Sequence, residues 1–343
     1  MESAVQTGAP VTPHSLLQMH MAMAASRVLS TALQLRLFSH LAAGHETADA
    51  LANAAGTSRR GTRMLLDALV ALGLLGKTGA RYMLPPASRA YLVRESPDYV
   101  GALMESEDLW NAWSGLPDAV RTGRPVTSVE RQERAEAFFP ILIRSLHVAN
   151  RAPAHRLAAV LGAGTRPQGL RILDVGAGSA VWSIALAEAD TKARVTAQDF
   201  PGVLKETARF VAQHGLTERF DYLAGDLNSV DFGVNRFDVI VLGNIVHSEG
   251  EVSSRRLFQR LAVALDTAGR LAILDFFPNE ERTGPPPAVL FALNMLVNTE
   301  NGDTFTLSQY RNWLEEAGFA AIETVDIGEQ GGMPAPAIIA TRL

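Results

Sequence analysis

From residue 169 onward, short apolar runs alternate with longer segments of helical periodicity, and this alternation constrains the fold more than any other feature. The apolar runs are LRILDV, ARVTAQD, RFDYLAG, FDVIVLG and GRLAILD. Strands that alternate with helices of about 10–15 residues form right-handed βαβ units and a mainly parallel sheet. After Phe319, AIETVDIG and PAIIATRL add two strands that we expect to form an antiparallel edge pair. The sequence therefore predicts an α/β domain with a mostly parallel, seven-stranded sheet.

The N-terminal part of the chain lacks this alternation and is predicted to be helical, with one small hairpin. Apolar side chains recur at helical spacing from Leu33 to Leu41, and a shorter helix follows that ends at Gly56. SRRGTRMLLDALVALG forms a stronger amphipathic segment, and LLGKTGARYML reads as a hairpin around Lys77-Thr78-Gly79. Three helices and a hairpin in this order make a winged helix.

Residues 98–163 continue as helices, with breaks expected near Pro117, at Gly123-Arg124-Pro125 and near Pro140. We therefore divide the chain into a mainly helical domain over residues 1–160 and an α/β domain over residues 161–343. Near the N-terminus, residues 15–43 carry more apolar side chains than one helical stripe can bury. Such an excess usually marks a subunit interface, so we expect a homodimer. The side chains concerned include Leu16, Leu17, Met19, Met21, Met23, Val28 and Leu29.

Composition excludes several classes of site and partner. The chain has no cysteine, which excludes disulfides, zinc–thiolate sites, iron–sulfur clusters and a cysteine nucleophile. Its net charge of −5 gives no reason to expect nucleic-acid binding by the whole protein. No apolar run reaches the ~18 residues that span a bilayer, and no signal-peptide pattern is present. We expect a cytoplasmic protein without a metal site or a membrane partner.

Glycines and a carboxylate mark the end of the first predicted strand, the edge at which open α/β sheets bind ligands. In DVGAGS, Gly176 and Gly178 allow a tight turn close to a ligand. A dinucleotide site would place another glycine at position 181, which is Val181, so a pyrophosphate ligand is disfavoured. A strand that ends in Asp174 instead suits a cationic ligand such as a sulfonium nucleoside.

The next strand ends extend this predicted site. Asp199 ends the second strand, where a carboxylate can accept both hydroxyls of a ribose. AGDL ends the third strand, and Asp226 there can accept the exocyclic amine of an adenine that lies against Leu227. We place Phe200, which follows Asp199, and Asn244, at the end of the fourth strand, in the same cofactor-binding group.

A candidate general base lies at the same edge of the sheet. His247 follows the fourth strand in GNIVHS, and the ordinary imidazole pKa of ~6.5 suits a base at neutral pH. Asp275 ends the fifth strand, so its carboxylate can hold the second imidazole nitrogen and stabilise the imidazolium. The two residues predict proton transfer at this edge.

These motifs resemble S-adenosylmethionine-dependent O-methyltransferases that act on small molecules, such as plant caffeate and flavonoid enzymes and bacterial tailoring enzymes. The resemblance covers essentially the whole chain. Its motifs are LLDALVALGLL, DAVRTGRP, DVGAGSA, QDFPGV, AGDL, NIVHSE, GRLAILDFFP and NGDTFTLSQYRNWLEEAGF. It implies a winged-helix dimerisation domain before a Rossmann-like methyltransferase domain. It also implies that Gly176 and Gly178 lie under the methionine part of the cofactor, that Asp199 holds the ribose, and that His247 is the base.

The sequence departs from this family in two places. The family often has aspartate and an aromatic residue after its histidine, where Ser248 and Glu249 stand here. The plant enzymes also carry a second carboxylate beside the base, and the corresponding position is Thr304, with Asp303 adjacent. Asp275 matches the first carboxylate.

The acceptor pocket is predicted from the middle helices and the segment after the fifth strand. Aromatic and apolar side chains with a few amides would line a flat cavity, which suits an aromatic acceptor. The candidates are Trp113, Phe139, Ile143, His147, Phe291, Asn294, Met295 and Asn298.

Two other functions remain open on sequence grounds. Arg59, Arg60 and Arg63 begin the strongest helix of the winged-helix segment, the position of a DNA-recognition helix. A relative of the same family could instead methylate nitrogen or carbon, or bind the cofactor without transferring methyl. His247 favours transfer to a hydroxyl.

Overall fold

The computed structural model describes residues 11–126, 132–330 and 333–343, except for the side chains of 132–141, 330 and 333–335. The chain divides into two compact units, residues 1–106 and 107–343. The described helices between residues 107 and 160 therefore belong to the same unit as the sheet, while the domain boundary expected at residue 160 stays a prediction. None of the helices in the described residues is both long and apolar enough to cross a membrane.

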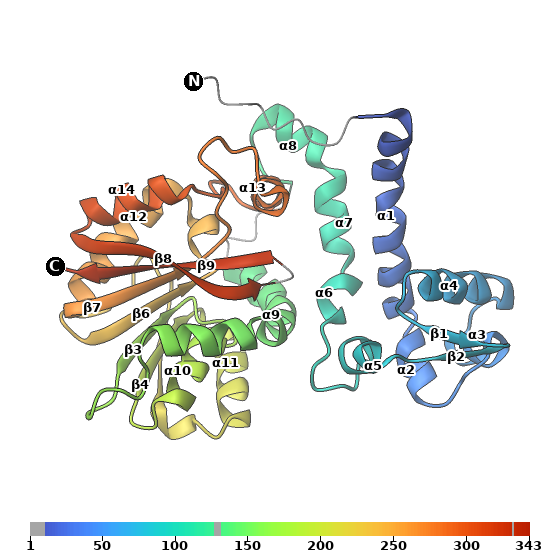
Figure 1. Cartoon of the computed structure of the whole chain (residues 1–343), viewed down its shortest axis with the longest axis horizontal. Coiled ribbons are helices and arrows are strands. Elements are labelled where there is room, and N and C mark those ends of the chain that lie inside the picture. Colours follow the sequence, from blue (N-terminus) through green and yellow to red (C-terminus); the bar gives the residue numbers. More distant parts are fainter. Residues whose placement is uncertain (1–10, 127–131, 331–332) are drawn as a thin grey trace. The chain divides into compact units, whose positions relative to one another are not determined.

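The first unit contains the expected winged helix (Figure 1). Its apolar core is formed mainly by Leu33, Leu37, Phe38, Leu51, Leu66, Leu69 and Tyr82. The helical periodicity of residues 33–41 is interrupted, because Arg36 adopts a left-handed conformation with φ 54°. The elements are α1 (Pro13–Gln34), α2 (Leu37–Ala42), α3 (Ala48–Ala55), α4 (Arg59–Ala71), β1 (Gly76–Thr78), β2 (Arg81–Met83), α5 (Pro86–Leu92) and α6 (Gly101–Glu105).

Two of the three arginines of α4 are engaged within this unit. Arg59 forms an ion pair with Asp49, and Arg63 pairs with Asp67. Asp67 also forms an ion pair with the ammonium group of Lys77 in the hairpin. Two of the three arginines expected to contact DNA are thus paired with carboxylates, which disfavours the DNA-binding alternative.

The second unit is built on a seven-stranded sheet of order β5-β4-β3-β6-β7-β9-β8, as expected from the sequence. The first five of these strands run parallel, and the last two join antiparallel at the edge. The strands are β3 (Arg171–Val175), β4 (Arg194–Asp199), β5 (Phe220–Ala224), β6 (Phe237–Gly243), β7 (Leu265–Leu274), β8 (Phe319–Gln330) and β9 (Met333–Arg342).

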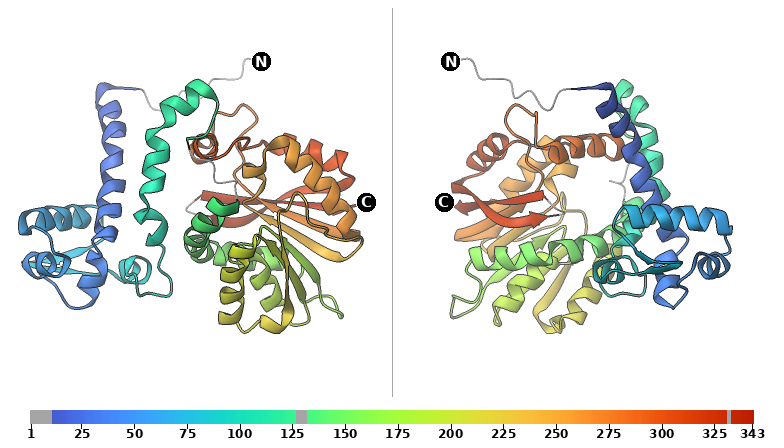
Figure 2. Two further views of the ribbon diagram at one scale, coloured as in Figure 1. Left: turned by 180° about the vertical axis from the view of Figure 1, so that it is seen from behind. Right: turned by 45° about the vertical axis from the view of Figure 1, so that its right-hand side comes forward.

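Helices cover both faces of this sheet (Figure 2). Alternate residues of β3 face opposite layers: Ile172 packs with α9, α10 and α11, whereas Leu173 packs with α12 and α14. The helices are α7 (Glu107–Ser114), α8 (Leu116–Thr122), α9 (Gln132–Val160), α10 (Val181–Ala189), α11 (Pro201–Gln213), η1 (Thr217–Arg219), α12 (Val246–Ala264), α13 (Pro286–Asn298) and α14 (Leu307–Glu316). The break expected near Pro140 is wrong, since α9 is continuous through that position.

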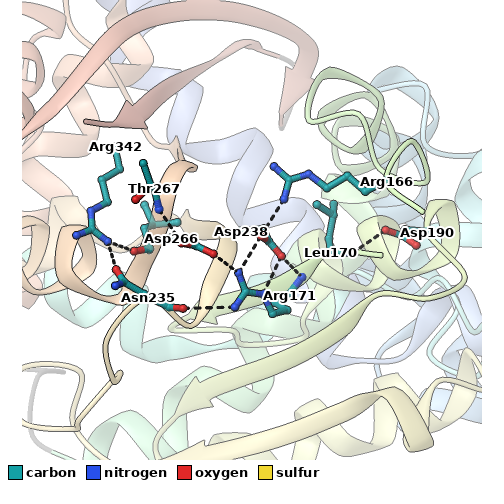
Figure 3. Close-up of polar contacts among 10 residues, drawn as sticks. Arg166, Leu170, Arg171, Asp190, Asn235, Asp238, Asp266, Thr267 and Arg342 are labelled. Atoms are coloured by element: carbon teal, nitrogen blue, oxygen red, sulfur yellow. Dashed lines mark hydrogen bonds and ion pairs between the residues drawn. The ribbon is translucent and has the colours of Figure 1, made fainter. Parts of the chain in front are cut away.

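An ion-pair cluster ties the strands together at the edge opposite their carboxyl ends (Figure 3). Arg171, the first residue of β3, donates to both Asp238 of β6 and Asp266 of β7. Arg166 reaches the same Asp238 at 2.8 Å. Although burial opposes it, hydrogen bonding from Arg171 lowers the pKa of Asp238 below its ordinary value. The cluster fixes the amino ends of β3, β6 and β7, and the opposite edge is left for a ligand.

Candidate active site

A cavity of about 360 Å³ opens at the carboxyl ends of β3, β4, β5 and β6, entirely within the second unit. Its volume is in the range of about 300–1,000 Å³ that small-molecule and cofactor sites occupy. Seven of the eight residues predicted to bind a cofactor line it: Gly176, Gly178, Asp199, Phe200, Asp226, Leu227 and Asn244.

The glycine corner after β3 forms one wall of the cavity. Gly176 and Gly178 have φ of +62° and +55°, in the left-handed region that favours glycine. A Cβ on Gly176 would lie 2.2 Å from Cδ1 of Ile245, so a larger residue would require the Ile245 side chain to move. The left-handed backbone angles are the main reason why this turn favours glycine.

Gln198 connects two of the strand ends and was not anticipated from the sequence. Its Oε1 accepts a hydrogen bond from the Gly176 N–H at 3.2 Å, and its Nε2 donates to the Gly225 carbonyl at 2.7 Å. The side chain is 1% exposed. Its position directly before Asp199, at the end of a predicted strand, is the signal that could have identified it.

Asp199 stands at the end of β4, next to the glycine corner. Its two carboxylate oxygens accept hydrogen bonds from the backbone N–H groups of Gly178, at 2.9 Å, and Phe200, at 2.7 Å. These bonds fix the position of the carboxylate in the wall of the cavity. Burial raises the pKa of Asp199 to about 6 in spite of them.

The side chains that line the cavity are acidic rather than basic. Among the described residues that line it are Asp199, Asp226 and Glu249, while lysine and arginine are absent from that set. A positive ligand would stabilise the ionised form of Asp199, which burial disfavours. The carboxylates of the lining therefore fit a cationic nucleoside, the class of ligand expected from the sequence.

Asp174 lies behind the glycine corner and is absent from the cavity lining. It is 1% exposed and accepts a hydrogen bond from the Ser183 hydroxyl of α10 at 2.5 Å. Burial, with a smaller contribution from nearby Asp199, raises its pKa to about 7. Its contact in the structure is thus with the helix that follows the corner, because β3 directs this side chain toward α10.

The far end of the cavity combines Asp226, Leu227, Asn228 and Glu249. Asp226 Oδ1 accepts the Asn228 backbone N–H at 2.8 Å, and the Asn228 side chain donates to Glu249 at 2.8 Å. Glu249 thus occupies the wall at the position where the resembling family often has an aromatic side chain.

Asn150 of α9 is a second lining residue that the sequence did not reveal. The residue is 1% exposed, and its Oδ1 makes no hydrogen bond. A buried acceptor without a donor is destabilising, and native structures usually supply the donor from a ligand or water. Asn150 therefore marks a place where a bound molecule would supply a hydrogen bond.

His247 and Asp275 are brought together as the sequence predicted. The His247 Nδ1 lies 2.6 Å from Asp275 Oδ1, and the His247 backbone N–H donates to Asp275 Oδ2 at 3.1 Å. The Asp275 side chain is fully buried and that of His247 is 10% exposed. Ile245 and Ser248, on either side of His247 in sequence, line the cavity, whereas His247 and Asp275 are absent from its lining.

Tyr310 of α14 completes this pair and was not predicted. Its hydroxyl donates to Asp275 Oδ2 at 3.0 Å. The contact joins residues 35 positions apart, and nothing in the local sequence around Tyr310 indicates it.

Asp303 and Thr304 have different surroundings. Asp303 forms an ion pair with Arg282 at 3.1 Å, and its side chain is 41% exposed. Thr304 is 1% exposed. Gly302 passes so close to the His247 carbonyl oxygen that a Cβ would lie 2.6 Å from it. The segment thus approaches His247 through its backbone while Asp303 faces Arg282.

Most predicted acceptor residues gather on α13 and α7. Trp113 Nε1 donates to Asn294 Oδ1 at 3.2 Å, and Asn298 Nδ2 donates to the Asn294 carbonyl at 2.9 Å. Phe291 packs edge-on against the His247 ring, with 4.9 Å between ring centroids, and stacks on Phe276.

The remaining acceptor candidates have other surroundings. Met295 is buried on α13, where its Cβ approaches Gly302. Ile143 lines the cavity and contacts the Gly178 corner. His147 stacks on Phe210 of α11 and is absent from the lining of the cavity. The side chain of Phe139 lies outside the described part of the structure. In the described chain, acidic and histidine side chains form no cluster of three that could hold a metal ion.

Comparisons with known proteins identify the family. Residues 161–320 match the model of an O-methyltransferase domain, and residues 17–94 match an O-methyltransferase dimerisation domain. A 3-hydroxy-5-methyl-1-naphthoate 3-O-methyltransferase from Streptomyces sahachiroi is 31% identical, with 89% of each chain covered. The chain belongs to the O-methyltransferase family.

Two further similarities extend over nearly the whole length. A tetracenomycin polyketide synthesis 8-O-methyl transferase from Streptomyces glaucescens is 30% identical, covering 92% of this chain and 94% of its own. The crystal structure of an O-methyltransferase described as putative, from Nostoc punctiforme, superposes with a TM-score of 0.84 at 27% identity, covering 97% of this chain and 100% of that chain. The predicted fold and enzyme class, a methyltransferase dependent on S-adenosylmethionine, are confirmed.

Proposed function

We propose that this O-methyltransferase methylates a phenolic hydroxyl of a small aromatic molecule, with His247 as the general base. The buried pair of His247 and Asp275, which lies against the aromatic rings of Phe276 and Phe291, carries this proposal. A flat acceptor can stack on such rings while its hydroxyl approaches Nε2 of the imidazole.

The cavity residues would hold the cofactor. S-adenosylmethionine supplies an activated methyl group on a positively charged sulfur. Asp199 would accept hydrogen bonds from ribose hydroxyls, Asp226 would accept from the adenine amine, and the turn at Gly176 and Gly178 would lie under the methionyl chain. The acidic lining supports this assignment, because it favours a cationic ligand.

His247 would take the proton of the acceptor hydroxyl as the oxygen attacks the methyl carbon. Asp275 holds Nδ1, which leaves Nε2 to face the acceptor, and its negative charge stabilises the imidazolium that forms. Beyond this proton transfer, catalysis of the reaction depends on the alignment of the two reactants. Trp113, Asn294 and Asn298 would position the distal part of the acceptor.

The active protein is proposed to be a homodimer. Residues 17–94 match a dimerisation domain, and α1 exposes Leu17, Met19 and Met21 by 64%, 74% and 61%. Exposed apolar side chains gathered on one helix are typical of a subunit interface.

Incubation of the enzyme with cofactor carrying a labelled methyl group and a panel of acceptors tests the proposal. The panel should pair each phenol with its aniline counterpart and with its already methylated ether. We expect mass spectrometry to show label on the phenols and none on the ethers. Exclusive labelling of anilines would overturn the proposed acceptor class and point to N-methylation.

A further inference from the structure

The buried carboxylate of Asp275 accepts hydrogen bonds from four groups on three separate segments. Oδ1 faces the His247 Nδ1 and the backbone N–H of Phe276, while Oδ2 accepts from the His247 N–H and the Tyr310 hydroxyl. Of these donors only the Tyr310 hydroxyl comes from a side chain other than His247. Neither the family comparison nor the local sequence gives this tyrosine a role.

The packing around Tyr310 keeps its hydroxyl directed toward Asp275. The residue is fully buried, and its ring is surrounded by other aromatic rings at centroid distances of 5.2 to 6.4 Å. These rings belong to Phe258, Phe277, Phe305 and Trp313. Burial, together with the neighbouring Asp275, raises the pKa of Tyr310 well above its ordinary value. The phenol therefore remains a hydrogen-bond donor throughout the pH range in which an imidazole titrates.

The other charged groups near His247 have partners of their own. Asp303, whose backbone N–H donates to the His247 carbonyl, pairs with Arg282. Glu249, two residues along α12, accepts from Asn228. Asp275 is thus the carboxylate that contacts the imidazole directly, and any group that changes the charge density of Asp275 changes the proton affinity of His247.

We propose that Tyr310 is a positioning residue that sets the basicity of His247 through Asp275. The O–H dipole draws negative charge toward Oδ2, which weakens the attraction of Asp275 for the imidazolium and keeps the imidazole neutral at lower pH. It also holds the carboxylate so that Oδ1 meets Nδ1. This inference rests on the proposed function only where it concerns the rate, since the basicity of His247 is a property of the protein alone.

Tyr310→Phe removes the hydroxyl and keeps the ring. We expect the pKa of His247 to rise by about half a unit to one unit, the size that fits loss of one hydrogen bond to a charged group that is shared among several donors. The pKa is measured by NMR titration of ¹³C-labelled histidine, with the His247 signal assigned by its absence in His247→Gln. If His247 is the base, the rise of kcat/KM with pH moves upward by the same amount.

Tyr82→Phe is the matched control. Tyr82 is also buried, and its hydroxyl also donates to a carboxylate, that of Asp67 at 2.9 Å, but it lies in the winged-helix unit. This variant loses a comparable hydrogen bond and should leave the His247 titration unchanged. A general effect of losing a buried tyrosine hydroxyl would instead appear in both variants and would overturn the proposal.

A second substitution covers the case in which Tyr310→Phe folds poorly. Replacement of Tyr310 by 3-fluorotyrosine gives a more acidic phenol and hence a stronger donor, so the pKa of His247 should fall. An unchanged His247 titration in either folded variant refutes the proposal. A titration that moves while the pH profile of kcat/KM stays fixed supports the role of Tyr310 and refutes His247 as the base, so the two failures are distinguishable.

Discussion

The backbone N–H of Gly178 donates a hydrogen bond to the carboxylate of Asp199, 2.9 Å away, and so joins the glycine corner of β3 to the end of β4. The carboxylate that is proposed to bind ribose is therefore part of the turn that is proposed to cradle the methionyl chain. A substitution in one half of the proposed cofactor site should therefore also change the geometry of the other half.

Asp199→Ala should weaken binding of S-adenosylhomocysteine by about 1.5–3 kcal/mol, the range for hydrogen bonds to a charged group. Isothermal calorimetry at pH 7.5 measures this change. Asp221→Ala is the control, because Asp221 is exposed on β5 and absent from the cavity lining. An unchanged affinity in Asp199→Ala would remove this residue from the site.

Binding of S-adenosylhomocysteine should weaken as the pH falls below about 6. Burial raises the pKa of Asp199 to about 6, so the carboxylate is ionised above this pH and protonated below it. Ribose hydroxyls donate hydrogen bonds to the ionised carboxylate, hence affinity is greatest above pH 6 and is lost on acidification. Asp199→Asn cannot ionise and should show a flatter affinity profile between pH 5 and 7.

Asn150→Ala should lower cofactor affinity about tenfold while leaving the unliganded enzyme as stable as before or more so. The reason is that Oδ1 has no partner in the protein, so its removal relieves an unsatisfied buried acceptor but deprives the ligand of a hydrogen bond. Ser254→Ala is a matched control, since the Ser254 hydroxyl is also buried without a partner but lies outside the cavity lining. Calorimetry and thermal melts separate the two effects, and equal affinity changes in both variants would contradict the assignment.

The sequence was sufficient for those parts of the site that follow directly from strand ends. Gly176, Asp199 and Asp226 each lie at or just after the end of a strand of a parallel sheet, and the topology of such a sheet places these ends at one edge. His247 and Asp275 meet for the same reason, because β6 and β7 are neighbours. Residues that are distant in sequence come into contact when they end adjacent strands, and such contacts can be predicted from the strand order.

Residues contributed by helices could not be placed in this way. Asn150 reaches the cavity from α9 and Tyr310 reaches Asp275 from α14, and the rotation of a helix about its axis depends on packing that the sequence does not display. The same limit explains why the prediction that His147 lines the acceptor pocket could not be made reliably. His147 shares a helix with Ile143 but packs against Phe210. Pro140 was expected to break a helix on local grounds, yet α9 continues through it.

The wild-type protein should sediment as a dimer at low micromolar concentration, and Leu17→Asp combined with Met21→Asp should shift it toward monomer. The two side chains lie one helical turn apart on α1, on the same face, and are 64% and 61% exposed. Burying two carboxylates in an apolar interface is strongly unfavourable. Val252→Asp, at an exposed position of α12, is the control. Sedimentation of the wild type as a monomer would contradict the proposed assembly.

His247→Ala should reduce kcat for a phenolic acceptor by about 10²–10⁴, the usual size of general-base effects, with little change in cofactor affinity. Asp275→Asn should lower kcat as well, and the pH at which kcat rises should move downward because the imidazolium loses its compensating charge. Both variants are assayed across pH 5 to 9 beside calorimetry with S-adenosylhomocysteine.

Asp303→Asn is the informative comparison for this pair. Asp303 is adjacent to the position where plant relatives carry a second carboxylate, but its side chain pairs with Arg282, and only its backbone N–H contacts His247. Loss of its charge should therefore change kcat little. A large loss in Asp303→Asn with Asp275→Asn near wild type would reverse the assignment of the orienting carboxylate. Full activity of His247→Ala at neutral pH would mean that alignment alone is sufficient, or that the acceptor is an amine, which needs no strong base.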